Sequence, residues 1–172
     1  MKKRRLIFIF AASLAVIGST ASVTYAYLTG QDRAENLIGT TENEIHIEEE
    51  FEPPSDPGPG TLIKKAPRIV NDSEVGVYVR AAVCFSDSAA EHFCEPLAVN
   101  GDWRLAADGY YYYDAVLAPG GTTGTIFDRI VIREDVEAEE LVPFDLLVYA
   151  ESVQSFGMTQ EEAWAYYGGG AG

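Results

Sequence analysis

Histidine, cysteine and basic residues are scarce in this chain, and their scarcity argues against several classes of function. The 172 residues include two histidines, two cysteines and 12 Lys plus Arg, against 27 Asp plus Glu, so the formal net charge is −15. A strongly acidic surface repels phosphate groups, so we expect no nucleic acid partner. The sequence also lacks an HExxH motif, a nucleophile elbow, a phosphate-binding loop and a CxxC pair. We therefore expect no enzyme activity, no catalytic residue, no cofactor and no metal site.

The chain has so many acidic residues that some of them are expected to be adjacent by chance. We interpret Glu48, Glu49 and Glu50 as a solvated strand edge and not as a general acid and base. A calcium site is the alternative, because exported β proteins bind this ion through oxygen ligands, but no regular loop spacing is present. The candidate ligands would be Asn71, Asp72 and Glu74, or Asp87 near Glu91.

The first 26 residues have the layout of a signal peptide. Four basic residues precede an apolar run from Leu6 to Ile17, and Thr24-Tyr25-Ala26 places small side chains at the −3 and −1 positions of a cleavage site. We place the cut between Ala26 and Tyr27, so that the membrane is involved only through the leader before cleavage. The alternative is an uncleaved membrane anchor over residues 6–28. Cleavage would leave 146 residues with 8 basic and 27 acidic side chains, enough for one soluble, secreted domain.

Cys84 and Cys94 lie close together in the stretch CFSDSAAEHFC. Outside the cytoplasm such a pair is expected to form a disulfide that closes a short polar loop. Two free thiols in a reducing niche are the alternative. A zinc site is disfavoured, because only His92 and Glu91 could complete it within one tight loop.

Residues 40–167 are predicted to form one mainly β domain. Apolar residues alternate in EIHIEEEF and most clearly in EVGVYVRAAVCF, where Val75 to Phe85 share one face at every second position. Between these strands, residues 52–60 are rich in proline and glycine and predict an exposed loop. A further strand over TLIKKAPRIVND is restricted by Pro67 to an edge or a bulge.

Four more strands and one helix complete the predicted domain. A hairpin turned at Asp108-Gly109 joins a strand around Trp103 to a strand over 110–117, and further strands are expected over 122–132 and 141–154. Many short strands between turns indicate an antiparallel β-sandwich or jelly roll. Thr159 and Glu162 form a capping box that begins a short helix, which would dock by Trp164, and residues 168–172 form a flexible tail.

Taken in order, these pieces resemble the exported TasA/camelysin group. The resemblance is carried by AYLTG, EIHIEEEFEPP, KKAPRIVNDSEVGVYVRAAVCF, the WxxxxDGYYYY hairpin, PGGTT before IFDRIVI, and VYAESVQ before EEAWAYY. It implies a jelly-roll β-sandwich, a leader cut by a SipW-type signal peptidase, and secretion to the cell surface, where some members form biofilm matrix fibres. The protease activity described for camelysin-like members is not expected here, because no zinc-binding helix is present.

The mechanism that we expect is strand addition between copies or related matrix subunits. Cleavage would free residues 27–39 to complete the open edge of another sheet, with apolar contacts from Tyr27, Leu28, Leu37 and Ile38. The alternative is that this segment pairs within its own domain or stays loose.

Two other functions follow from different residues. A binding module for a sugar or a protein would use an exposed face of Trp103, Tyr111 and Tyr113, although alternation makes two of the four tyrosines at 110–113 core residues. A metal-dependent hydrolase would need His46 clustered with three carboxylates.

Overall fold

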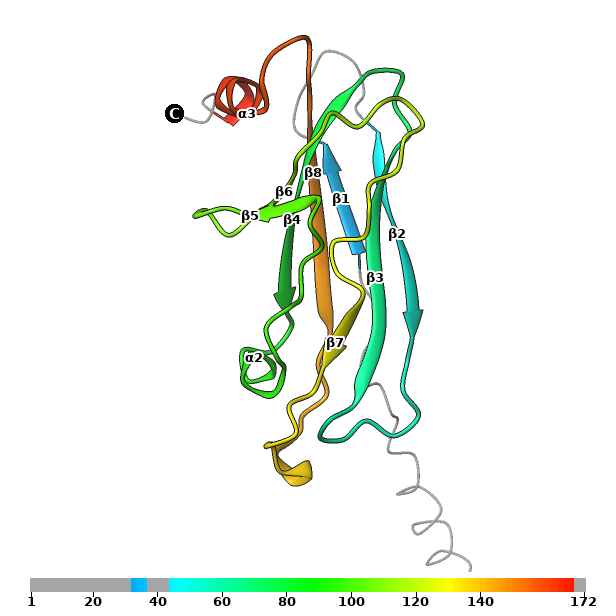
Figure 1. Cartoon of the computed structure of the whole chain (residues 1–172), viewed down its shortest axis with the longest axis vertical. Coiled ribbons are helices and arrows are strands. Elements are labelled where there is room, and N and C mark those ends of the chain that lie inside the picture. The colour runs from blue at the N-terminus through cyan, green and yellow to red at the C-terminus, as the bar shows by residue number, and fades with distance from the viewer. Residues whose placement is uncertain (1–31, 37–43, 169–172) are drawn as a thin grey trace, which may run out of the picture.

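The computed structural model describes the backbone of residues 32–36 and, after a gap, residues 44–168. It is a β-sandwich with a short C-terminal helix, as predicted (Figure 1). The predicted signal peptide and most of the tail lie outside the described residues. No helix in the described part has the length and apolarity needed to cross a bilayer.

The larger sheet has five strands in the order β1-β8-β4-β6-β5. Its strands are β1 (Asp32–Asn36), β4 (Val77–Phe85), β5 (Trp103–Leu105), β6 (Tyr111–Tyr113) and β8 (Leu146–Gln154). The pairs β4–β8, β4–β6 and β5–β6 are antiparallel, whereas β1 runs parallel to β8. Because β1 belongs to the sandwich, the domain begins before residue 40, inside the predicted lead segment.

The smaller sheet has three antiparallel strands in the order β2-β3-β7. They are β2 (Ile45–Glu52), β3 (Leu62–Asn71) and β7 (Arg129–Val131). Over its described strands the chain changes sheet four times, between β1 and β2, β3 and β4, β6 and β7, and β7 and β8, as jelly-roll-like connections require. The loop between β2 and β3 contains the prolines of the predicted 52–60 loop.

The core between the sheets follows the predicted alternation. Val77, Val79 and Ala81 of β4 are fully buried and face Ile69 of β3 and Phe127. Lys65 and Glu49 also face inward, and their side chains form a buried ion pair. Burying two charges costs free energy unless each has a close partner, and here each of the two side chains supplies the other's partner.

Pro67 occupies the central strand of the smaller sheet instead of an edge. It lies opposite Glu49 of β2, and its carbonyl accepts a hydrogen bond of 2.8 Å from the Ile126 amide on the other side. Since the nitrogen and carbonyl of a strand residue point to the same side, the missing N–H removes no bond to β2. Regular pairing to β7 involves only residues 62–64, so proline is tolerated here.

The strand predicted over 122–132 is regular only at its end. Ile126 and Phe127 are consecutive and both fully buried, so this segment turns through the core and does not alternate. It contacts its neighbours through isolated bridges such as Val99 to Phe127. The last strand begins at Leu146, later than predicted, because Pro143 cannot donate to a ladder.

Two short helices pack at the ends of the larger sheet. α2 (Ala90–Phe93) lies between the cysteines and was not predicted, whereas α3 (Gln160–Gly168) begins at the predicted capping box. The Thr159 amide donates to Glu162 Oε2 at 2.8 Å, and the Glu162 amide donates to Thr159 Oγ1 at 3.3 Å. α3 docks on the outer face of the larger sheet through Trp164, as predicted. The connection between β7 and β8 holds the 3-10 turn η1 (Ala138–Glu140).

Candidate functional site

The outer edge of β8 is the first candidate site, because β1 occupies it by backbone pairing. The first strand of the described chain here joins the last, with a register that runs from Asp32 opposite Val148 to Asn36 opposite Ser152. β1 also lies beside β2, on the side where the two sheets approach each other (Figure 1). The segment predicted to add a strand to another copy thus supplies a strand to its own sheet.

The residues predicted for cleavage and assembly fall outside the described residues. These are Ala26 and Tyr27 at the cut, and Tyr27, Leu28, Leu37 and Ile38 as apolar contacts. β1 lies between the two predicted apolar pairs.

The predicted disulfide between Cys84 and Cys94 is wrong for this structure, in which both are free thiols. Cys84 is on the outer face of β4 and exposed, because it shares the parity of Tyr78 and Arg80. Cys94 is buried in the core at a bridge to Ile132. The spacing suggested a closed loop, but strand alternation turns the first side chain away from the second. Burial raises the pKa of Cys94 to about 11, which keeps it protonated and unreactive.

The aromatic face predicted for the binding alternative is also wrong. Trp103 is buried, its indole N–H donates to the Gly124 carbonyl at 3.0 Å, and its ring packs against Tyr113. Tyr111 and Tyr113 pack on the same core. The alternation of the tyrosine run is as predicted, so Tyr110 and Tyr112 lie on the outer face of the sheet instead.

An arginine–aromatic cluster covers that outer face. Arg80 of β4 lies between the rings of Tyr110 and Trp164, with its guanidinium carbon 4.1 and 4.3 Å from the two ring centroids. It also pairs with Glu151 of β8 at 2.6 Å, and the two side chains are only 19% and 16% exposed. Glu151 neutralises the charge of Arg80, and aromatic rings stack on both faces of its guanidinium group. Arg80 therefore links the hairpin, β8 and α3.

Hydrogen bonds extend this cluster to its rim. Arg80 donates to the Tyr112 hydroxyl at 3.0 Å, which donates to Asp108 Oδ2 at 2.7 Å. The bond from Tyr112 lowers the pKa of Asp108, whereas burial raises the pKa of Tyr112. The Tyr112 ring is therefore held in one position with its hydroxyl protonated.

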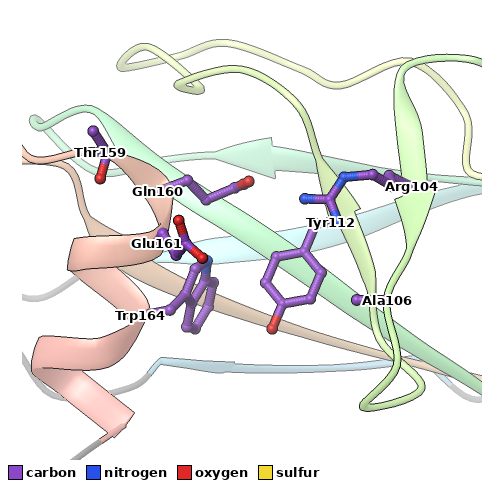
Figure 2. Close-up of a pocket in the computed structure, with 7 residues that line it drawn as sticks. All are labelled: Arg104, Ala106, Tyr112, Thr159, Gln160, Glu161 and Trp164. Carbon is purple, nitrogen blue, oxygen red and sulfur yellow. The ribbon is translucent and has the colours of Figure 1, made fainter.

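A solvent-open groove of about 480 Å³ lies beside the cluster, between α3 and the β5–β6 hairpin. Figure 2 shows Tyr112 between Trp164 on the helix side and Arg104 on the hairpin side. The first turn of α3 forms the other wall. The groove is lined by Arg104, Ala106, Tyr112, Thr159, Gln160, Glu161 and Trp164.

His46 does not gather the carboxylates that a hydrolase would need. Its Nδ1 bonds Asp72 and its Nε2 is 3.7 Å from Glu48, and all three side chains are exposed at the surface of the smaller sheet. The bond to Asp72 raises the pKa of His46. Within residues 44–168 no group of three or more His, Cys, Asp or Glu side chains is close enough to hold a metal ion.

The calcium candidates have structural roles or lie apart. Asn71 is fully buried, and its amide nitrogen donates to the carbonyls of Val75, Leu117 and Ala118. Its side-chain oxygen accepts from Ser73, so it is not available to an ion. Asp87 instead accepts a bond from the Ala89 amide at the start of α2.

Sequence reasoning missed Arg80 and the α3 groove. The sequence feature that could have pointed to this site is a single arginine among the apolar residues of a strand. A charge at such a position needs a partner on the same face of the sheet. Its partners come from Tyr110, Glu151 and Trp164, which are far apart in the sequence. No local pattern joins them.

Comparisons with protein-family models, with curated proteins and with solved structures find no match for this chain. The family resemblance drawn from the sequence therefore stays a hypothesis.

Proposed function

We propose that this chain is a secreted, non-catalytic structural protein of the cell surface or extracellular matrix, of the biofilm fibre type, that assembles through its N-terminal strand. In this proposal a SipW-type signal peptidase cuts after Ala26, and the leader holds the chain at the membrane until then. The support from sequence is the signal-peptide layout and the resemblance to TasA/camelysin proteins.

The observation that carries the proposal is the way in which β1 completes the larger sheet. Five residues supply the edge partner of β8, in parallel register from Asp32 opposite Val148 to Asn36 opposite Ser152. Without β1, the N–H and C=O groups on that edge of β8 would lack strand partners, and such an edge templates pairing with another chain. The same segment from a second copy would restore the same ladder.

The chain between β1 and β2 is long enough for such an exchange. Residues 37–44 separate the two strands, and eight extended residues reach up to about 28 Å. Exchange of an identical element gains the same contacts within or between copies, so concentration and the freed N-terminus decide which form prevails. Cleavage after Ala26 would then control assembly.

Comparing two purified forms tests the proposal. A chain that begins at Tyr27 is expected to give concentration-dependent oligomers or fibres by light scattering and electron microscopy. A chain that begins at Thr40 has no strand to donate and is expected to form none of these fibres, but to bind an added peptide of residues 27–39 at its open β8 edge. N-terminal sequencing of the secreted product checks the cut itself.

Identical monomers from both forms would refute strand addition. A product that keeps residues 1–26 in the membrane would refute the export model. A peptide of the same composition in scrambled order is the control for unspecific binding.

A further inference from the structure

The α3 groove presents polar groups of opposite kinds on facing walls. On the hairpin side Arg104 can only donate hydrogen bonds, and on the helix side Glu161 can only accept them. Gln160 donates its amide N–H to the Tyr113 carbonyl at 2.8 Å, and no described residue donates to its amide oxygen. A ligand matched to these walls must both donate and accept, as hydroxyl groups do.

Charged ligands fit the groove poorly. A cation would favour the ring faces of Tyr110 and Trp164, but Arg80 already occupies the space between them. An anion would meet Glu161 on a chain of formal charge −15. The start of α3 is also unfavourable for an anion, because the Glu162 carboxylate accepts from the Thr159 amide there and the Glu162 amide already donates to Thr159 Oγ1.

The floor of the groove is rigid and aromatic. The Tyr112 and Trp164 rings meet edge to face at 5.9 Å, and the Arg80 stack and the bond to Asp108 fix both of them. The Trp164 indole N–H is buried and has no hydrogen-bond partner among the described residues. This nitrogen is shielded from solvent, so the groove offers a ligand the ring of Trp164 and not its N–H. A site whose groups are already held in place loses little entropy on binding.

We propose that this groove binds a neutral saccharide. A sugar ring has C–H groups for the aromatic floor and hydroxyls that can donate to Glu161 and accept from Arg104. The volume of about 480 Å³ lies within the range of about 300–1,000 Å³ that is usual for small-ligand sites. The open mouth allows the sugar to be part of a longer chain. This activity is separate from strand addition and uses none of residues 27–39.

Tryptophan fluorescence of the chain beginning at Tyr27 gives a direct test. The sequence has two tryptophans, so Trp103→Phe leaves Trp164 in the groove as the reporter. Neutral tetrasaccharides of glucose, galactose, mannose and N-acetylglucosamine are the probes, with a tetragalacturonate as the anionic comparison. Saturation-transfer NMR on the unmodified chain checks the same binding without the substitution. We expect at least one neutral probe to bind and the anionic probe to bind more weakly.

Two groove variants and two matched controls locate the binding. Arg104→Ala and Glu161→Ala are each expected to weaken the affinity by about tenfold, the usual effect of one lost hydrogen bond to a charged group. Arg133→Ala and Glu139→Ala change the same residue types at exposed positions away from the groove and should leave the affinity unchanged. Melting curves confirm that every variant is folded.

Three results would overturn the proposal: no neutral probe binds, the anionic probe binds best, or the groove variants bind as well as the controls. Assembly measured on the same samples is independent of these outcomes. A failed sugar site would therefore leave strand addition standing, and the reverse also holds.

Discussion

The two edges of the larger sheet are built in opposite ways. At one edge β5 pairs with β6 across a tight turn at Gly109, so strand and partner are neighbours in sequence. At the other edge β1 pairs with β8, the first strand with the last. A hairpin closes a short loop at small entropic cost, whereas a remote strand must be brought back over the whole domain. The hairpin edge is therefore a fixed part of the fold, whereas in the proposed strand addition the β1 edge is the one that another copy would replace.

Breaking the ladder of β1 should have the largest effect. The variant Arg33→Pro/Ala34→Pro places prolines at two adjacent positions of β1. Because adjacent residues of a strand turn their N–H groups to opposite sides, one of the two prolines removes a donor that faces β8. We expect oligomers to disappear by light scattering while the monomer keeps its far-UV circular dichroism. Ser55→Pro/Asp56→Pro, in the loop between β2 and β3, is the control. Unchanged assembly in the β1 variant would remove β1 from the mechanism.

Removing Arg80 should loosen the hairpin edge and leave the β1 edge intact. Arg80→Ala deletes both ring stacks and leaves Glu151 half-buried without its cation, which we expect to cost about 2–3 kcal/mol of unfolding free energy. Hydrogen exchange should rise over residues 103–113 more than over 146–150. Arg133→Ala, which breaks an exposed pair with Asp135, should leave the free energy of unfolding almost unchanged. Equal costs would show that the stack contributes nothing.

The turn of the hairpin should give a smaller effect. Gly109 has a φ of +86°, where a side chain is strained, so Gly109→Ala should cost about 1 kcal/mol by urea unfolding. Gly101→Ala is the matched control, because its added methyl group would meet no atom within 4 Å. Assembly should be unchanged in both variants, and a loss of oligomers with Gly109→Ala would implicate the hairpin edge.

The smallest effect concerns the start of β2, beside β1. The hydrogen bond to Asp72 raises the pKa of His46, so the protonated form is favoured in the folded state. The stabilisation is complete below the unfolded pKa of about 6.5 and is lost as pH rises through the higher folded pKa. The melting temperatures of the wild type and His46→Gln should therefore differ at about pH 6 and converge in alkaline buffer. A difference that grows with pH would contradict this assignment.

Alternation and turn chemistry made most of the sandwich predictable. Val77, Val79 and Ala81 face the core as their parity required, and Thr159 and Glu162 cap α3 as their spacing required. These features depend on residues only a few positions apart, so short sequence patterns are sufficient to predict them. The proline-rich loop followed from the same kind of evidence.

Features that depend on distant partners were not predictable in the same way. β1 has no clear pattern of its own and becomes a strand because β8 offers an edge. The cysteines are near each other in sequence but lie on opposite sides of a strand. Arg80 finds its ring partners only once α3 folds onto the sheet.

The inward position of Lys65 restricts where the folded surface can be modified at an amine. The sequence has four lysines, of which Lys2 and Lys3 belong to the predicted leader, and the Lys65 side chain is fully buried. A product cut after Ala26 would offer acylating reagents or cross-linking enzymes a single side-chain amine, Lys64, which is 47% exposed. Apart from the new α-amine at Tyr27, such a protein would be joined covalently to its surroundings, or to a dye, at one known point on the smaller sheet.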